Sequence, residues 1–228
     1  MSTECRLICL GLTPYERALK LQEKVLADVA DHLSPETLIL LEHPSTFTIG
    51  RAATSEANLL LPEEALRRVA EVYRVGRGGN VTFHGPGQLV GYPIMDLRRR
   101  QRDVHAYVRA LEEVLIRLLR DYGIFAEREE GLTGVWVGKS KIAAIGVQVR
   151  RGVSMHGFAL NVDPDLSFFS MIVPCGIRDR GVTSMSAVLG RRVSLQEVED
   201  RLIPHFEQVF SVTVKHSTAF PNLETANP

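Results

Sequence analysis

The spacing of hydrophobic residues divides the chain into helical and extended segments. One long helix is expected from about Asp103 to Tyr122, because apolar residues recur there every three or four positions and Gly123 follows as a terminator. Shorter helices are expected over residues 13–31, just after residue 62, and over residues 194–210. Runs rich in β-branched and aromatic residues predict strands at 5–10, 37–42, 46–49, 72–75, 88–95, 134–137, 141–149, 155–162 and 212–214. Strands outnumber helices, so the pattern predicts an α+β fold.

The helix boundaries carry capping signals. Thr13 followed by Pro14 and Glu16 predicts one capping box, and Ser194 with Glu197 predicts another. The charged face of the long helix is expected to be solvated and to carry no function; it consists of Arg109, Glu112, Glu113, Arg117 and Arg120. No repeat or linker interrupts the chain. We therefore expect residues 1–215 to form one domain, with the portion from about residue 190 packed on it, and residues 216–228 to form a polar tail.

Composition excludes several classes of protein. With 45% hydrophobic residues among 228, the chain is long enough to bury a substantial core. Its 27 basic and 27 acidic residues balance, which gives no electrostatic footprint for nucleic acid or an anionic membrane. No apolar run approaches the roughly 20 residues of a membrane helix. Residues 1–6 resemble neither a signal peptide nor a transit peptide, so a cytoplasmic protein is expected.

The three cysteines form no C-x-x-C pair, so the sequence indicates neither a disulfide framework nor a metal site. Cys5 and Cys9 fall four residues apart in a predicted strand and share a face, and we expect both to be small core residues. Cys175 differs, because it lies in a loop between Pro174 and Gly176 that would leave its sulfur and the following N–H accessible. This arrangement suits a nucleophile beside an oxyanion donor, although an incidental loop cysteine is the alternative.

A glycine-rich stretch over residues 76–93 holds six glycines, two prolines, Arg77 and His84. Glycine lets another molecule approach the main chain closely, at an entropic cost to folding. The functional interpretation is therefore a loop and strand whose N–H groups and His84 lie along a ligand. The alternative is a pair of tight turns between ordinary strands. Neither a dinucleotide-binding fingerprint nor a P-loop is present.

A nucleophilic cysteine needs a neighbouring base, and Lys139 and Lys141 are the candidates. Lys141 opens the run Ile-Ala-Ala-Ile-Gly, which is apolar on both faces, so burial could make its amine a usable base. The alternative is a lysine at a strand end that reaches solvent through its flexible stem.

Four segments taken together resemble the lipoyl(octanoyl) transferase family: residues 77–93, 141–146, 156–161 and 174–176. Their order and separations agree with the family, and the resemblance covers roughly residues 5–215. It selects Lys141 rather than Lys139, since the family lysine directly precedes Ile-Ala-Ala-Ile-Gly. The fold it implies is a mixed, mainly antiparallel sheet flanked by helices, like the catalytic domain of biotin and lipoate protein ligases, so that residues 1–215 would be an acyltransferase catalytic domain.

The resemblance implies octanoyl transfer from acyl carrier protein to a lysine of lipoyl domains. Cys175 would hold the acyl group as a thioester, and Lys141 would be its catalytic partner. The acceptors implied are lipoyl domains of 2-oxoacid dehydrogenase complexes and the glycine cleavage H protein. No cofactor, metal or ATP is implied, and a monomer is expected. The substrate-binding residues would be Arg77, Gly78, Gly79, Asn80, Val81, Thr82, Phe83, His84, Ala144, Ile145, Gly146, Gly157, Phe158 and Ala159.

Two rival interpretations remain at this point. An ATP-dependent lipoate or biotin protein ligase would share the fold, but Cys175 would then be dispensable. A non-catalytic module that binds acyl carrier protein or lipoyl domains would make the loop cysteine incidental. The roles of His84 and His156 are also open. His84 could hydrogen-bond near Cys175 and Lys141 or to the acyl carbonyl, and His156 could be structural.

Overall fold

The computed structural model of the 228-residue chain describes residues 3–52, 56–100, 103–173 and 180–217. The helices are α1 (Tyr15–Ala30), α2 (Glu63–Leu66), α3 (Val104–Asp121), α4 (Met185–Leu189) and α5 (Leu195–Phe210), with short 3-10 helices η1 (Glu56–Asn58), η2 (Leu97–Arg99) and η3 (Leu166–Met171). The strands are β1 (Thr3–Leu12), β2 (Glu36–Glu42), β3 (Thr46–Ile49), β4 (Glu71–Arg74), β5 (Val81–His84), β6 (Gln88–Ile94), β7 (Glu127–Glu129), β8 (Leu132–Val137), β9 (Ser140–Arg150), β10 (Val153–Asn161), β11 (Gly181–Val182) and β12 (Val212–His216).

A large sheet forms the centre of the molecule, with strand order β12-β1-β2-β6-β10-β9-β8-β7. Strands β12, β1 and β2 run parallel, and the pairs from β2 to β7 are antiparallel. Strand β11 adds a short parallel pairing beside β9. The prediction of a mixed, mainly antiparallel sheet flanked by helices is therefore confirmed. A second, three-stranded sheet has the order β4-β3-β5.

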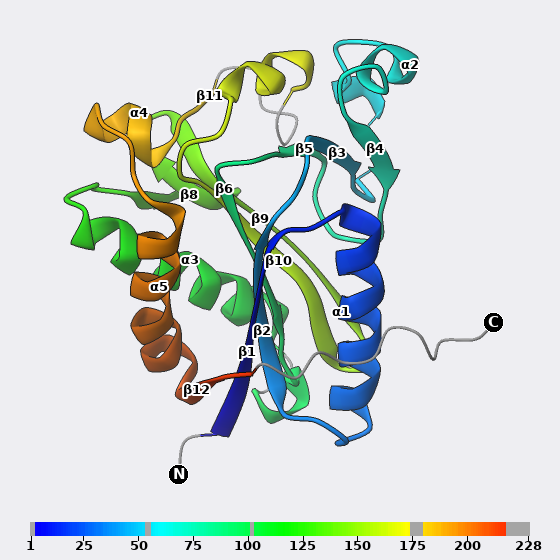
Figure 1. The fold of residues 1–228 in the computed structure, drawn as a ribbon, viewed down its shortest axis with the longest axis vertical. Helices are drawn as coiled ribbons and strands as arrows, with labels where there is room; N and C mark the ends of the chain where they lie inside the picture. Colours follow the sequence, from blue (N-terminus) through cyan, green and yellow to red (C-terminus); the bar gives the residue numbers. More distant parts are fainter. Residues whose placement is uncertain (1–2, 53–55, 101–102, 174–179, 218–228) are drawn as a thin grey trace.

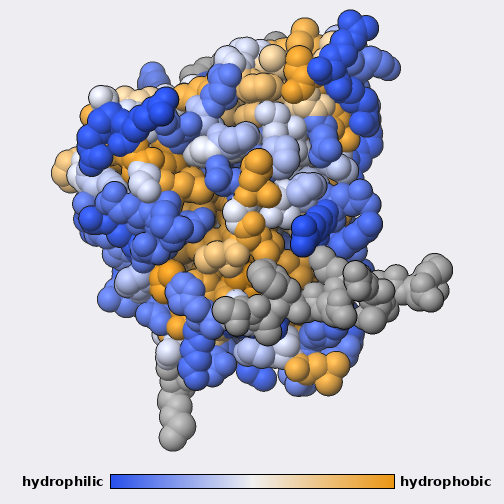
Figure 2. Space-filling view, viewed as in Figure 1, coloured by the Kyte–Doolittle hydropathy of each residue, from blue (hydrophilic) through white to orange (hydrophobic). Residues whose placement is uncertain are grey.

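Helices cover both faces of the large sheet (Figure 1). Helix α1 lies on one face and buries its apolar stripe, including Leu21 and Val25, against β2, β6 and β10. Helices α3 and α5 pack together on the other face, where Leu115 and Phe206 join a larger core. The outward faces of α1 and α5 are largely hydrophilic, and hydrophobic surface lies between them (Figure 2). The amphipathic pattern thus fixes which side of each helix meets the sheet.

The small sheet has its own core, built from aromatic and aliphatic residues of β3, β5 and η3. Phe83 stacks on Phe168 with ring centroids 4.4 Å apart, and Phe47 lies 5.3 Å from Phe83. This core holds β5, and with it the middle of the glycine-rich stretch, against the rest of the molecule. Within the described ranges, no helix is both long enough and apolar enough to cross a membrane.

Three local predictions are wrong. Thr13 does not cap α1 with its side chain, because its hydroxyl donates to the carbonyls of Leu10 and Gly11 and the cap position falls on Pro14. Cys9 is exposed although Cys5 is buried, because Cys5 joins the core formed with α3 and α5 and Cys9 does not. Glu112, placed on a solvated helix face, is completely buried against β8. The Ser194 cap of α5 is confirmed.

Candidate active site

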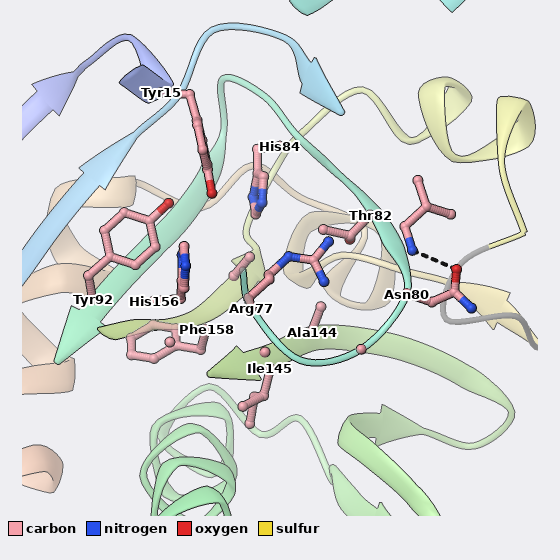
Figure 3. A pocket seen from close by; sticks show the side chains of 15 residues that line it. Tyr15, Arg77, Asn80, Thr82, His84, Tyr92, Ala144, Ile145, His156 and Phe158 are labelled. Carbon is pink, nitrogen blue, oxygen red and sulfur yellow. Dashed lines mark hydrogen bonds between the residues drawn. The ribbon is translucent and has the colours of Figure 1, made fainter. Parts of the chain in front are cut away.

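A narrow cavity lies where β5, β6, β9, β10 and the start of α1 meet (Figure 3). Its empty volume, including the open mouth, is about 470 Å³. The lining residues are Tyr15, Arg77, Gly79, Asn80, Val81, Thr82, His84, Tyr92, Ala144, Ile145, Gly146, His156, Gly157, Phe158 and Ala159. The structure therefore gathers residues far apart in the sequence around one site, where β5 of the small sheet lies beside the large sheet.

Most of the residues expected to bind substrate lie along this cavity. Those that do so are Arg77, Gly79, Asn80, Val81, Thr82, His84, Ala144, Ile145, Gly146, Gly157, Phe158 and Ala159. Gly78 and Phe83 are not among the lining residues, since Phe83 points into the aromatic core of the small sheet. Tyr15, Tyr92 and His156 line the cavity and were absent from the expected set. Tyr15 had no motif to reveal it, because it reaches the site from the first turn of α1.

The floor of the cavity consists of small residues on β9 and β10. Ala144 pairs with Ala159, and Gly146 pairs with Gly157. A Cβ on Gly157 would lie 2.2 Å from the Gly91 carbonyl oxygen, and one on Gly146 would lie 3.0 Å from the Gly78 carbonyl oxygen. Side chains at these positions would therefore force apart the backbones that form the cavity. The requirement for glycine here is one of close approach.

Arg77 starts a chain of buried polar groups that runs beneath the cavity. Its guanidinium donates to the Thr48 hydroxyl at 2.8 Å and to the Thr48 carbonyl oxygen at 2.7 Å. The Thr48 oxygen lies 3.4 Å from His84 Nε2, and His84 Nδ1 lies 2.8 Å from Gln88 Oε1. The Gln88 amide then donates to Asn161, which donates to the Thr183 carbonyl oxygen.

This network fixes the state of His84. An acceptor oxygen at Nδ1 requires the proton on that nitrogen, so Nε2 accepts from Thr48. Burial, together with the nearby His43 and Arg77, holds the pKa of His84 well below its ordinary value of 6.5. His84 is therefore a neutral ring with one fixed tautomer, suited to hold a neighbouring group in place but not to carry charge.

A second buried pair lies beside it. His43 Nδ1 donates to the Thr13 carbonyl oxygen at 2.7 Å, so its Nε2 accepts from the Tyr92 hydroxyl, also at 2.7 Å. Burial lowers the pKa of His43 to about 4. The Tyr92 ring in turn packs edge-on against His156, with centroids 6.4 Å apart. One wall of the cavity is thus polar, neutral and rigid.

Tyr15 and His156 complete that wall. His156 is 2% exposed and has a positive φ of 57°, which a non-glycine residue seldom adopts. Its backbone N–H donates to Gln22 Oε1, which stabilises this conformation. Neither the His156 ring nor the Tyr15 hydroxyl hydrogen-bonds to another described residue, and both lie along the cavity (Figure 3). Both are therefore available to a bound molecule.

The buried histidines predict an acid-sensitive fold. In the folded protein the pKa of both His43 and His156 is lowered from the ordinary value of 6.5 to about 4, because burial disfavours the charged form. The unfolded chain binds these protons first as pH falls below 6.5, so the free energy of unfolding decreases between the two values, by about 3 kcal/mol per histidine. Urea unfolding at pH of about 7.5 and about 5 should show about 2 kcal/mol of this loss per histidine, because pH 5 still lies above the folded pKa values.

The control variant is His43→Gln, whose amide can keep both hydrogen bonds but cannot take up a proton. Its stability should fall less between the two pH values than that of the wild type, by about 2 kcal/mol. An equal loss in both proteins would show that folding does not lower the pKa of His43.

Lys141 lies on β9, three residues before Ala144 and about 10 Å along the strand from it. It is 6% exposed, its Nζ donates to the Thr133 carbonyl oxygen at 3.0 Å, and it lies 4.7 Å above the centroid of the Trp136 ring. Its carbonyl oxygen accepts from Thr183 N–H, next to β11. The amine is therefore buried and hydrogen-bonded to β8, while the main chain of Lys141 is bonded to the residue after β11; Lys141 is not among the cavity-lining residues.

Cys175 lies outside the described residues, as do its neighbours Pro174 and Gly176. The described chain on either side of this segment is anchored. Val173 N–H donates to the Asn58 carbonyl oxygen before it, and β11 pairs with Ser140 and Lys141 after it.

Comparison with known proteins gives consistent matches. Residues 14–207 match the model of the lipoyl protein ligase A/B catalytic domain family. The chain is 49% identical over 203 residues to an octanoyltransferase of Caldanaerobacter subterraneus subsp. tengcongensis, covering 89% of each chain. It is 53% identical over 207 residues to an octanoyltransferase of Solibacter usitatus, covering 90% of this chain and 93% of the relative.

Among solved structures, a lipoate-protein ligase A bound with ATP superimposes with a TM-score of 0.79 at 20% identity, covering 97% of this chain and 92% of that one. At this identity the likeness establishes the fold alone. It confirms the expectation of a fold like that of lipoate protein ligase catalytic domains.

Proposed function

Since the chain belongs to the lipoyl protein ligase A/B catalytic domain family, we propose that it is an octanoyltransferase of protein lipoylation. The donor would be octanoyl-acyl carrier protein in the cytoplasm. The acceptors would be lysines on lipoyl domains of 2-oxoacid dehydrogenase complexes and on the glycine cleavage H protein. The proposal rests on the narrow cavity, whose floor consists of small residues of β9 and β10. Strand β9 also carries the buried Lys141.

The first half-reaction forms an acyl-enzyme. Lys141 takes the proton of Cys175, and the thiolate attacks the thioester carbonyl of the donor. Collapse of the tetrahedral intermediate breaks the bond to the carrier sulfur, which leaves with the proton from Lys141. One thioester replaces another, so this step is close to thermoneutral and requires no ATP.

In the second half-reaction the acceptor lysine attacks the Cys175 thioester. Lys141 receives a proton from the attacking amine, and the Cys175 sulfur leaves and is reprotonated. An amide is more stable than a thioester, so this step is downhill and drives the overall transfer.

The oxyanion of both intermediates needs N–H donors. Gly78 N–H is already bonded to the Val147 carbonyl oxygen at 2.9 Å, so it is committed to the fold. Gly79, which lines the cavity with a positive φ of 81°, is a candidate within the same loop. The N–H groups near Gly176 are the other candidates.

A larger side chain on the cavity floor should block the acyl group. Each buried methylene contributes about 0.8 kcal/mol, so an octanoyl chain gains roughly 5 kcal/mol. We expect Ala144→Leu to displace about half of the chain and lower the octanoylation rate at limiting donor by about 50- to 100-fold. Single-turnover kinetics with octanoyl and butanoyl donors measure this effect, and the butanoyl rate should change little.

Val149→Leu provides the control, because Val149 lies on the same strand but is exposed. It should leave both rates unchanged. Equal losses for octanoyl and butanoyl donors in Ala144→Leu would place the acyl group elsewhere.

Intact mass after incubation with octanoyl-acyl carrier protein and no ATP tests the proposed function. We expect a gain of one octanoyl group that hydroxylamine removes and that maps to Cys175. Transfer that appears only with ATP and free octanoate would support the ligase alternative. No adduct and no transfer under either condition would support a binding module.

A further inference from the structure

Glu112 is a fully buried carboxylate on the face of α3 that packs against β8 and β9. Its Oε2 accepts from Arg109 at 2.7 Å and from Arg128 at 3.2 Å. Both arginine side chains are partly exposed, at 51% and 36%. Its Oε1 accepts from the backbone N–H of Gly134 at 3.1 Å, and that N–H is buried. Glu112 thus accepts hydrogen bonds from two arginines that can also reach water and from one N–H that cannot.

The Gly134 N–H belongs to the same peptide unit as the Thr133 carbonyl. Lys141 Nζ donates to that carbonyl oxygen at 3.0 Å. The atoms of a peptide unit lie in one plane, so a bond that fixes the N–H also fixes the direction of the C=O. Glu112 therefore sets the orientation of the acceptor that holds the Lys141 amine.

Gly134 is fitted to this contact. Its φ is +124°, and a Cβ there would lie 2.7 Å from the Ala143 carbonyl oxygen and 3.3 Å from Lys141 Cε. Glycine is thus required by its positive φ and by the close approach of the Ala143 carbonyl, beside which the lysine side chain passes. The backbone conformation and the carboxylate act on the same peptide unit.

We infer that Glu112 is a positioning residue for Lys141, acting through the peptide unit of Thr133 and Gly134. The inference rests on the proposed function, in which Lys141 is the base for Cys175. The alternative is that Glu112 only ties α3 to β8 through its charge. The two roles depend on different properties of the side chain. Positioning needs a side chain long enough to reach Gly134, whereas a charge tie needs the negative charge beside Arg109 and Arg128.

Two substitutions separate reach from charge. Glu112→Asp keeps the charge but is one methylene shorter, so it cannot reach both the arginines and Gly134 N–H. Glu112→Gln keeps the length and an oxygen that can accept from Gly134, while the arginines turn to water. Glu113→Gln is the matched control, because Glu113 pairs with the same Arg128 at 2.7 Å but no hydrogen bond joins it to β8.

The readouts are the single-turnover octanoylation rate and the rate of Cys175 alkylation by iodoacetamide, mapped by peptide mass. Peptide mapping separates Cys175 from the two other thiols: burial raises the pKa of Cys5 to about 12 and slows its reaction, and alkylation of the exposed Cys9 is counted separately. We expect Glu112→Asp to slow both reactions by about 10- to 100-fold with an unchanged KM for the donor. Glu112→Gln and Glu113→Gln should stay within about threefold of the wild type.

Urea unfolding shows separately how much each variant is destabilised, and a charge tie would make Glu112→Gln the less stable of the two. The inference would be overturned if Glu112→Asp were fully active and Glu112→Gln slow, since a charge tie predicts this order of rates. Wild-type rates in both folded variants would overturn it as well. Lys141→Met keeps the two proposals apart: if it too is fully active, the proposed function fails, and if it is slow while Glu112→Asp is not, only this inference fails.

Discussion

Replacing Cys175 with alanine is expected to abolish octanoyl transfer and to remove the octanoyl adduct from the protein. Without the sulfur there is no acyl-enzyme, and the acceptor lysine would have to attack the carrier thioester with no assembled second site. Loss of a covalent nucleophile costs roughly 10⁴-fold or more in other enzymes that use one. The measurement is transfer to a purified lipoyl domain from octanoyl-acyl carrier protein, together with intact mass.

Cys9→Ala is the control for this substitution. Cys9 is an exposed thiol on β1, so any adduct caused by non-specific thiol acylation would form there as well. The control should keep full activity and the full mass gain. Transfer by Cys175→Ala at the wild-type rate would refute the covalent mechanism and leave the ligase alternative to be tested with ATP.

Regular elements could be predicted from the sequence because their signals are local. The long helix α3 ends at Asp121 with Gly123 in a positive-φ conformation, as its apolar spacing and terminal glycine indicate. The strands β9 and β10 were visible as apolar runs separated by a short turn. The floor of the cavity follows from these strands, since Ala144, Gly146 and Gly157 belong to the recognisable segments.

Features that depend on distant contacts could not be predicted. Phe83 lies within the glycine-rich stretch, but alternation along β5 turns it toward Phe168 and away from the cavity. Tyr15 reaches the cavity because α1 crosses the face of the sheet beside β6 and β10, which no local pattern records. Glu112 belongs to the charged set of α3, and its burial depends on the packing of β7 and β8, which bring Arg128 and the Gly134 N–H to its carboxylate.

The Lys141 environment shows why a strand lysine can be a functional residue instead of a surface residue. The apolar run that follows it made a buried position conceivable, but a lysine at a strand end can equally extend to water. In the structure the side chain runs across β8, between the Thr133 carbonyl and the Trp136 ring. The amine is thus placed by β8 and, through Gly134, by α3.

Lys141→Met is therefore expected to lower both half-reactions by about 10²- to 10⁴-fold, the usual contribution of a positioned acid–base group. Methionine keeps much of the length of the lysine stem and its packing on Trp136, so the loss should come from the amine and not from the fold. Lys141→Arg, which keeps a positive charge but cannot give up its proton, should be similarly slow. Pre-steady-state acylation of Cys175 and aminolysis of the isolated acyl-enzyme measure the two steps separately.

Lys139→Met is the matched control, because Lys139 lies two residues away in the exposed turn before β9. It should react at the wild-type rate in both steps. If Lys141→Arg matches the wild type, charge alone is sufficient and Lys141 stabilises the intermediate without transferring a proton. If Lys141→Met slows only acylation, Lys141 activates Cys175 but another group accepts the proton of the incoming amine, and the neutral, cavity-lining His156 is the first residue to test.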